Sequence, residues 1–386
     1  MRPVEPVMRR VMMSALGLVI VMTCVACGDG EDTKADGVLG VPQLLRTLAP
    51  LGRGPEELAR VERMTEVAAF GGHAVWNERR RSGWILVHAT SRRVERLPLA
   101  AGRAASAIDL GPGADGTPTL VYARCDQAAD CSVHAYDLRR NTDRRMTELD
   151  RAGTVVERAS VWRDDIAFVR RTIGSANVDV LLLDGVSGRL DKVPSEPAVE
   201  CLYGARPVRS CRAEIQSLDL GAELLAHSWT GRFADDYSVP GTPHVMRRSD
   251  GRDRRLFTGY ISEACGSLAG NAMQVRGHTV QYIRRLYNCA YDSSSLRRYD
   301  FSTRRTTRVN PPPLRRGNGI AHAMARDGRD TYWLYVKRTR PYESYPDTCD
   351  ASKGGGCRIL RSRDLQFIPA QPGDPRPSDG AENGIA

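Results

Sequence analysis

From residue 64 onward, the 386-residue chain repeats one pattern of short β-rich runs and turns. Each repeat has two β-rich runs, a turn, a third run that ends in a small or acidic residue, a second turn and a basic fourth run. The second of these turns begins at Thr90, Asp137, Asp184, Asp250, Asp300 and Ser362, with spacings of 47, 47, 66, 50 and 62 residues. The sequence therefore predicts six related units, and this repeat constrains the fold more than any other feature.

The composition of each unit favours strands over helices. Asp or Ser followed by polar and Gly-containing residues is typical of hairpin turns, and the flanking Val, Tyr, Leu and Ile suit half-buried strands. No apolar period of 3.6 residues extends across the region. Four short strands at a period of about 40–50 residues are the pattern of propeller blades. We therefore predict an all-β, six-bladed β-propeller of four-stranded blades over residues 63–370; the alternative is a β-sandwich or two smaller all-β domains.

The second unit carries the clearest family resemblance. Its Asp115-Gly116 turn precedes the apolar run Thr119 to Ala123, and the unit ends in Arg145-Met-Thr-Glu-Leu149. This arrangement resembles the TolB-like six-bladed propeller repeat, whose blades carry a Pro-Asp-Gly turn before an apolar strand and end in an Arg-Leu-Thr-like strand. Arg326-Asp327-Gly328 is similar to a second copy of that turn. The resemblance covers residues 64–370 and implies the fold, but it implies little about activity because propellers host many functions.

The first 26 residues predict a signal peptide. Arg2, Arg9 and Arg10 precede a 16-residue apolar run from Val11 to Ala26, which is typical of an export signal. A helix that spans a bilayer core needs roughly 20 residues, so an uncleaved anchor is the weaker alternative.

The end of the apolar run resembles a bacterial lipoprotein signal. It reads Cys24-Val-Ala-Cys27 and then turns polar and acidic. The resemblance implies that Cys27 receives a diacylglycerol on its sulfur and becomes the mature N-terminus. Cys24 stands where this family usually has Leu, which leaves cleavage after Ala26 without lipid as an alternative. We expect residues 27–62 to form the lipidated N-terminus and a flexible tether, and the Pro/Gly-rich residues 371–386 to form a disordered tail.

The remaining cysteines fit an exported chain. Without Cys24 and Cys27 there are eight, and they fall into four pairs that are close in sequence: Cys125 and Cys131, Cys201 and Cys211, Cys265 and Cys289, and Cys349 and Cys357. An even count in an exported protein favours structural disulfides, and no C-x-x-C or Cys/His cluster indicates a metal site. We predict nearest-neighbour pairing, with Cys125–Cys131 and Cys349–Cys357 flanking the second-to-third hairpin of their units.

Motifs of known catalytic sites are missing from the sequence. No G-x-S-x-G, H-E-x-x-H, P-loop or G-x-G-x-x-G pattern occurs, and no two histidines stand at metal-ligand spacing. We therefore predict no catalytic motif, no resident metal and no cofactor.

One set of residues is a candidate binding site. The first strand of each propeller blade lines the central channel, and polar residues recur in these segments: Glu66, Asp109, Glu157, Glu214, Glu263 and His322. If they face the channel, these side chains could bind a cation or a cationic group. The alternative is that some of them point elsewhere, because strand boundaries read from a sequence err by a few residues.

Arginine pairs recur on the third and fourth strands, for example Arg144-Arg145 and Arg254-Arg255. Fourth strands are outermost in a blade, so these pairs are typical of a charged edge that prevents pairing between sheets. Attraction to anionic envelope polymers or lipid head groups is the alternative. We expect no nucleic-acid binding, because interleaved surface aromatics are missing.

The function that these features favour is a membrane-tethered, extracytoplasmic binding or scaffold module. We expect a monomer held at the membrane by its lipid anchor, with an envelope protein or an anionic cell-wall polymer as partner. An envelope hydrolase or lyase that uses the channel acids is the alternative.

Overall fold

A computed structural model provides the structure. It describes residues 42–48, 55–80, 83–99, 104–127, 130–176, 178–194, 202–203, 206–207, 212–232, 238–257, 260–262, 266–288, 291–309, 319–328, 330–337, 349–350 and 357–363. The secondary structure in these ranges is β-strand apart from one 3-10 helix, η1 (Thr147–Leu149).

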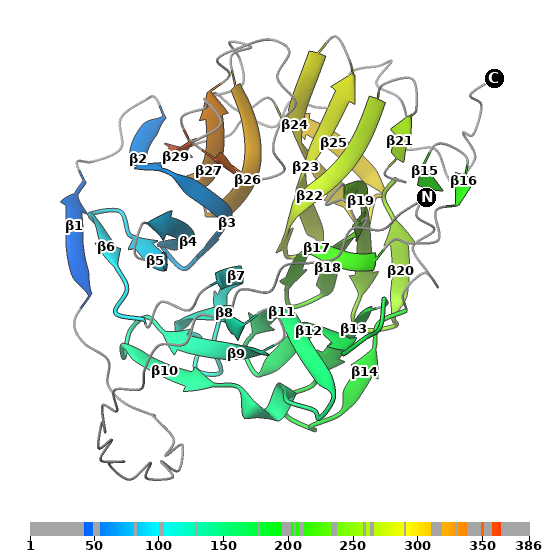
Figure 1. The fold of residues 1–386 in the computed structure, drawn as a ribbon, viewed down its shortest axis with the longest axis horizontal. Helices are drawn as coiled ribbons and strands as arrows, with labels where there is room; N and C mark the ends of the chain where they lie inside the picture. The colour runs from blue at the N-terminus through cyan, green and yellow to red at the C-terminus, as the bar shows by residue number, and fades with distance from the viewer. Residues whose placement is uncertain are drawn as a thin grey trace, which may run out of the picture. The chain divides into compact units, whose positions relative to one another are not determined.

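The strands form six four-stranded blades around a common centre, as predicted (Figure 1). From the centre outward, the first three blades are β3 (Arg63–Phe70), β4 (His73–Arg80), β5 (Gly83–Ala89), β6 (Arg93–Arg96); β7 (Ala104–Pro112), β8 (Pro118–Gln127), β9 (Asp130–Asp137), β10 (Thr142–Arg145); and β11 (Thr154–Trp162), β12 (Asp165–Thr172), β13 (Val178–Leu183), β14 (Leu190–Lys192). The last three are β17 (Arg212–Leu220), β18 (Leu224–Arg232), β19 (Ser238–Arg247), β20 (Arg252–Arg255); β22 (Gly266–Arg276), β23 (Thr279–Asn288), β24 (Tyr291–Asp300), β25 (Arg305–Val309); and β26 (Gly319–Asp327), β27 (Asp330–Lys337), β29 (Cys357–Arg363), β2 (Glu56–Val61).

The first strands of the six blades form a closed ring, which we call the inner ring. Around it β3 contacts β7, β7 contacts β11, and the contacts continue through β17, β22 and β26 back to β3. The other described strands extend this frame: β1 (Gln43–Thr47) pairs with β6, β21 (Tyr260–Ser262) with β22, β28 (Cys349–Asp350) with β3, and β15 (Leu202–Tyr203) with β16 (Arg206–Pro207).

The N-terminal segment closes the propeller. Strand β2 is the outermost strand of the sixth blade, where it pairs with β29, and β1 covers the outer edge of the first blade. Both strands lie within residues 27–62, where the sequence predicted a tether, so the ordered domain begins earlier than expected. The physical reason is that a ring of blades must join its ends, and a strand from the start of the chain can pair with the last blade and bury Leu58 and Val61 between blades.

The predicted turns are built by their first residues. Asp137, Asp184 and Asp300 each accept a hydrogen bond at Oδ1 from the backbone N–H three residues later, at 2.8–2.9 Å. This contact is the local reason that Asp initiates turns. The prediction for Ser362 was wrong, because this residue lies within β29 and its Oγ accepts a hydrogen bond from Trp333 Nε1 at 2.8 Å.

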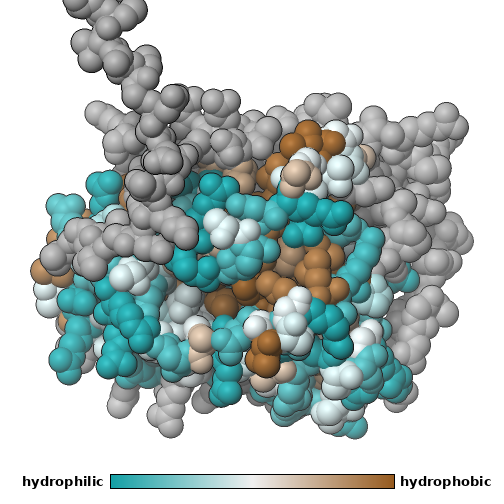
Figure 2. Space-filling view, turned by 90° about the horizontal axis from the view of Figure 1, so that it is seen from below, coloured by the Kyte–Doolittle hydropathy of each residue, from teal (hydrophilic) through white to brown (hydrophobic). Residues whose placement is uncertain are grey.

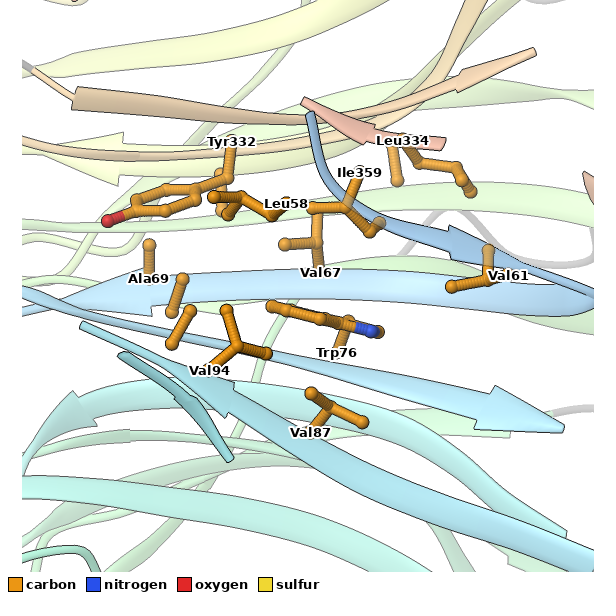
Figure 3. Packing of buried hydrophobic residues seen from close by; sticks show 14 of the residues in the cluster. Leu58, Val61, Val67, Ala69, Trp76, Val87, Val94, Tyr332, Leu334 and Ile359 are labelled. Atoms are coloured by element: carbon orange, nitrogen blue, oxygen red, sulfur yellow. The ribbon is translucent and has the colours of Figure 1, made fainter. Parts of the chain in front are cut away.

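Six apolar clusters hold the blades together, one at each interface between neighbours. Between the sixth and first blades, Trp76 packs with Val67, Leu58, Tyr332 and Ile359 (Figure 3). Trp76 and Ile359 are completely buried. The core therefore lies between the faces of the blades and leaves the ends of the strands available for function.

Candidate functional site on the inner ring

The structure places the predicted acids on the inner ring but gives them partners. Glu66, Asp109, Glu157 and Glu214 lie on β3, β7, β11 and β17. His322 lies on β26, although the structure does not describe its side chain, and Glu263 lies outside the described residues.

Two of these acids form ion pairs with arginines, and in each case at least one of the arginines belongs to another blade. Glu66 forms an ion pair with Arg158 and accepts the backbone N–H of Ile108 at 2.8 Å. Glu157 pairs with Arg171 at 2.5 Å and with Arg212 at 2.9 Å. Glu214 also interacts with another group. Glu66 and Glu157 therefore join blades to one another, and their negative charges are offset by arginines.

A repeated motif places two buried carboxylates at equivalent positions. Ile108-Asp-Leu-Gly111 in β7 matches Leu218-Asp-Leu-Gly221 at the end of β17. Oδ2 of Asp109 accepts the Ser160 hydroxyl at 2.6 Å and the Val161 N–H at 3.3 Å, and Oδ2 of Asp219 accepts the Val275 N–H. Each motif thus binds the inner strand of the following blade.

The glycine of each motif permits this close approach. A Cβ atom on Gly111 would lie 2.0 Å from the Val161 carbonyl oxygen, and one on Gly221 would lie 2.5 Å from Val275 Cγ1. Any larger residue would push the neighbouring blade away and break the hydrogen bond of the adjacent aspartate.

Arg276 joins several blades through backbone carbonyl groups. From the end of β22, it donates to the carbonyl of Val275 at 2.6 Å, to that of Arg326 at 3.0 Å and to that of Ala69 at 3.0 Å. One guanidinium therefore joins the fifth, sixth and first blades.

Burial changes the proton affinity of both aspartates. It raises the pKa of Asp109, against the lowering effect of its hydrogen bonds to Ser160 and Val161 and of the Arg276 charge. Burial and the negative charge of Asp109 raise the pKa of Asp219 to about 8, and the Arg276 charge opposes this rise. The protonated form of Asp219 is therefore favoured at neutral pH.

Replacing Asp219 by asparagine is expected to change how stability depends on pH. A folded-state pKa of about 8, above the usual 3.8, means that the contribution of Asp219 to stability is greatest below about pH 4 and is lost as the pH rises toward 8. The asparagine side chain cannot titrate, but its amide oxygen can still accept the Val275 N–H. We expect the free energy of unfolding of D219N, relative to wild type, to rise by about 1 kcal/mol or more between roughly pH 5 and pH 8.

Urea unfolding at several pH values measures this difference. Asp250→Asn is the control, because the Arg247 hydrogen bond lowers the pKa of the exposed Asp250 to about 2 and that group does not titrate in the window. If the free energy of unfolding changed with pH in the same way for D219N and wild type, Asp219 would be ionised throughout this pH range and its pKa would not be raised.

Sequence reasoning selected Glu214 and missed Asp219 and Arg276. The sequence did contain a signal for Asp219, because the Asp-Leu-Gly motif occurs at the same position in two of the repeated units. Arg276 gave no such signal, since its carbonyl partners come from blades that are distant in the sequence, 50 and 207 residues away.

The described residues contain no group of three or more His, Cys, Asp or Glu side chains that could hold a metal ion. In the same part of the chain, no helix is long and apolar enough to span a membrane. Cys27, Cys201, Cys211, Cys265 and Cys289 lie outside it.

One predicted cysteine pair is present as a disulfide. Cys125 and Cys131 are bonded across the β8–β9 hairpin, where they stand directly opposite each other. Cys357 is also disulfide-bonded. Cys349 does not flank the second-to-third hairpin as expected, because it lies in β28, opposite Met64 of the first blade. Cys349 and Asp350 thus pair with the inner strand of the first blade.

No protein-family model matches the chain, and no curated protein matches it. Many solved structures are similar to this chain, among them the following three. TolB from Acinetobacter baumannii has 11% identity and a TM-score of 0.43, with 77% of this chain and 65% of TolB covered. The β-propeller domain of the trilobed protease from Pyrococcus furiosus has 9% identity and a TM-score of 0.42, with 82% and 99% covered. An oligogalacturonate lyase from Vibrio parahaemolyticus has 7% identity and a TM-score of 0.45, with 84% and 98% covered. The chain therefore spans about two thirds of TolB.

Proposed function

We propose that this protein is a membrane-tethered, extracytoplasmic binding or scaffold module of the β-propeller type. The signal and the Cys27 motif support export and lipid attachment. The inner ring supports a scaffold role, because its described acids tie blades together instead of standing free around a reaction centre.

The main support for this proposal comes from strand β1, which lies close to Cys27 in the sequence and exposes apolar and cationic side chains. Gln43 stands only 16 positions after Cys27, so a lipid on Cys27 would hold the start of β1 within about 55 Å of the membrane. The side chains of Leu44 and Leu45 are exposed, at 59% and 47%. Arg46 and Arg92 are exposed on or beside the same strand pair. Apolar and cationic side chains together suit an anionic lipid surface.

The other large apolar side chains that are strongly exposed in the described residues, Ile173, Val186 and Leu190, all belong to the third blade, which is much farther along the chain from Cys27. On the face shown in Figure 2, hydrophilic residues (teal) predominate and apolar residues (brown) gather in a few areas between them. The first blade would thus face the membrane and leave other blades free for a partner.

A protein is the better-supported partner of the two predicted. Many outer arginines already have carboxylate partners, such as Arg144 with Glu148 at 3.0 Å and Arg145 with Asp150 at 2.9 Å. Paired arginines attract an anionic cell-wall polymer less than free ones would. They instead fit the charged edge that keeps a propeller monomeric.

An envelope hydrolase or lyase is the second candidate, and the raised pKa of Asp219 favours it. Two carboxyl groups of different proton affinity are a common acid–base arrangement. The two candidate functions predict different results for Asp219→Asn. If Asp219 is a general acid, the variant loses enzymatic turnover; if Asp219 only joins blades, the variant changes in stability alone.

Replacing Leu44 and Leu45 together by serine is expected to weaken membrane binding at least tenfold. Each leucine contributes roughly 1 kcal/mol when it is partly buried in lipid, and about 1.4 kcal/mol is a factor of ten. The measurement is co-sedimentation of residues 28–386, which keep β1 and β2, with phosphatidylglycerol-containing vesicles.

The matched control is Ile173→Ser with Val186→Ser, which removes two apolar side chains of the third blade that are at least as exposed as Leu44 and Leu45. We expect this pair to bind vesicles like the wild type. Equal losses in both double variants, or no vesicle binding by the wild type, would contradict a membrane-facing first blade.

A further inference from the structure

Three blades contain a histidine on the third strand that is hydrogen-bonded through Nδ1 to an acid on the fourth strand. The pairs are His88–Glu95 at 2.8 Å, His134–Asp143 at 3.1 Å and His244–Asp253 at 2.8 Å. The recurrence of the pair in the first, second and fourth blades indicates that the pair by itself stabilises the contact between outer strands.

The three blades differ in what meets the other ring nitrogen, Nε2. In the first blade it meets Nδ1 of His73 at 2.7 Å. In the fourth blade, Nε2 of His244 is buried without a hydrogen-bond partner among the described groups. In the second blade it meets the hydroxyl of Ser132 at 3.1 Å. Of these three blades, only the second therefore combines a serine, a histidine and an acid in one line.

The hydrogen bonds fix the direction of this line. Asp143 accepts from Nδ1–H of His134, so Nε2 carries the lone pair and accepts the proton of Ser132. Tyr122 donates to the same carboxylate oxygen at 3.0 Å, and burial together with the Asp143 charge raises the pKa of Tyr122, so that it stays a donor. Such a hydrogen-bonded series of serine, histidine and acid activates a serine as a nucleophile, because the histidine can accept the serine proton and the acid orients the histidine.

Neighbouring contacts fix the positions of Ser132, His134 and Asp143, whose side chains remain partly exposed to solvent. The side chains of His134 and Asp143 are 12% and 16% exposed, and Ser132 is half-buried. The Cys125–Cys131 disulfide joins the two strands next to Ser132. Arg124 stands directly opposite Ser132 on the same face of the sheet, where its positive charge would offset an oxyanion.

We propose that Ser132, His134 and Asp143 form a nucleophilic site that acts on carboxylic esters. Ser132 Oγ forms a bond with the ester carbonyl carbon while its proton moves to His134 Nε2. The bond to the alcohol breaks, and the alcohol takes that proton. Water then attacks the acyl-serine in the same way, releases the acid and restores Ser132. Esters fit better than amides because an alkoxide leaves more readily than an amine anion.

A fluorophosphonate probe tests this site without knowledge of the natural ester. The full mature protein is treated at about pH 8, and the modified residue is mapped by peptide mass. We expect the adduct on Ser132 and no such adduct in Ser132→Ala. His134→Gln is expected to slow labelling at least about 100-fold, because a general base contributes factors of that size. Asp143→Asn is expected to slow it at least tenfold.

His244→Gln is the matched control, because it removes the corresponding histidine of the fourth blade, where no serine is bound. It is expected to label at the wild-type rate, which separates loss of a base from loss of an outer-strand contact. An unlabelled Ser132, or equal labelling rates for H134Q and wild type, would overturn the proposal. Neither outcome bears on membrane tethering, which rests on Cys27 and β1.

Discussion

Replacing Asp330 by alanine is expected to lower the free energy of unfolding by about 3–5 kcal/mol, because it leaves a buried charge without its partner. Arg361 is only 1% exposed, and its Nε and Nη2 atoms bond to Asp330 Oδ2 at 3.1 and 2.7 Å. Oε2 of Glu56, in β2, lies farther away, 3.9 Å from Arg361 Nη1. The ion pair therefore lies where the N-terminal strand closes the ring.

Arg361→Met tests whether the cost comes from the unpaired charge. Methionine fills much of the same volume without a charge, so we expect R361M to lose less stability than D330A. The double variant is expected to regain part of the D330A loss. Urea unfolding measures all three, and a D330A variant within about 1 kcal/mol of wild type would mean that Arg361 finds another partner or reaches water.

The repeat was sufficient to predict the architecture, because it rests on local chemistry. Turn-forming aspartates and short β-rich runs stand close together in the sequence, and their hydrogen bonds span two or three residues. Ring closure was not predictable in this way. Residues 56–61 (EELARV) lie outside the repeat, and their partner strand is about 300 residues away at Arg358.

The candidate site was predicted only in outline for the same reason. Sequence reasoning placed acids on the inner strands, but it could not show that Glu66 meets Arg158, 92 residues later. It also gave no weight to Ser132 and His134, because a lone histidine is nonspecific and Asp143 comes within hydrogen-bonding distance only when β10 folds onto β9.

Replacing Cys27 by alanine is expected to release essentially all of the protein from the membrane fraction. In the lipoprotein interpretation, the diacylglycerol on this sulfur is the anchor, and Leu44 and Leu45 add only a weak, reversible contact. Cell fractionation with detection of the full chain measures the change. Cys24→Ala is the control, since that residue would be removed with the signal peptide and its variant should stay on the membrane.

The intact mass of the membrane-extracted mature protein tests the central claim of a tethered propeller most directly. We predict a chain that begins at Cys27 and carries a diacylglyceryl adduct. We also predict a gain of about eight hydrogens on reduction, as four disulfides require. An unmodified chain that begins at Cys27, or a chain that retains residues 1–26, would contradict the lipid tether. A smaller mass gain on reduction would contradict the full set of disulfides.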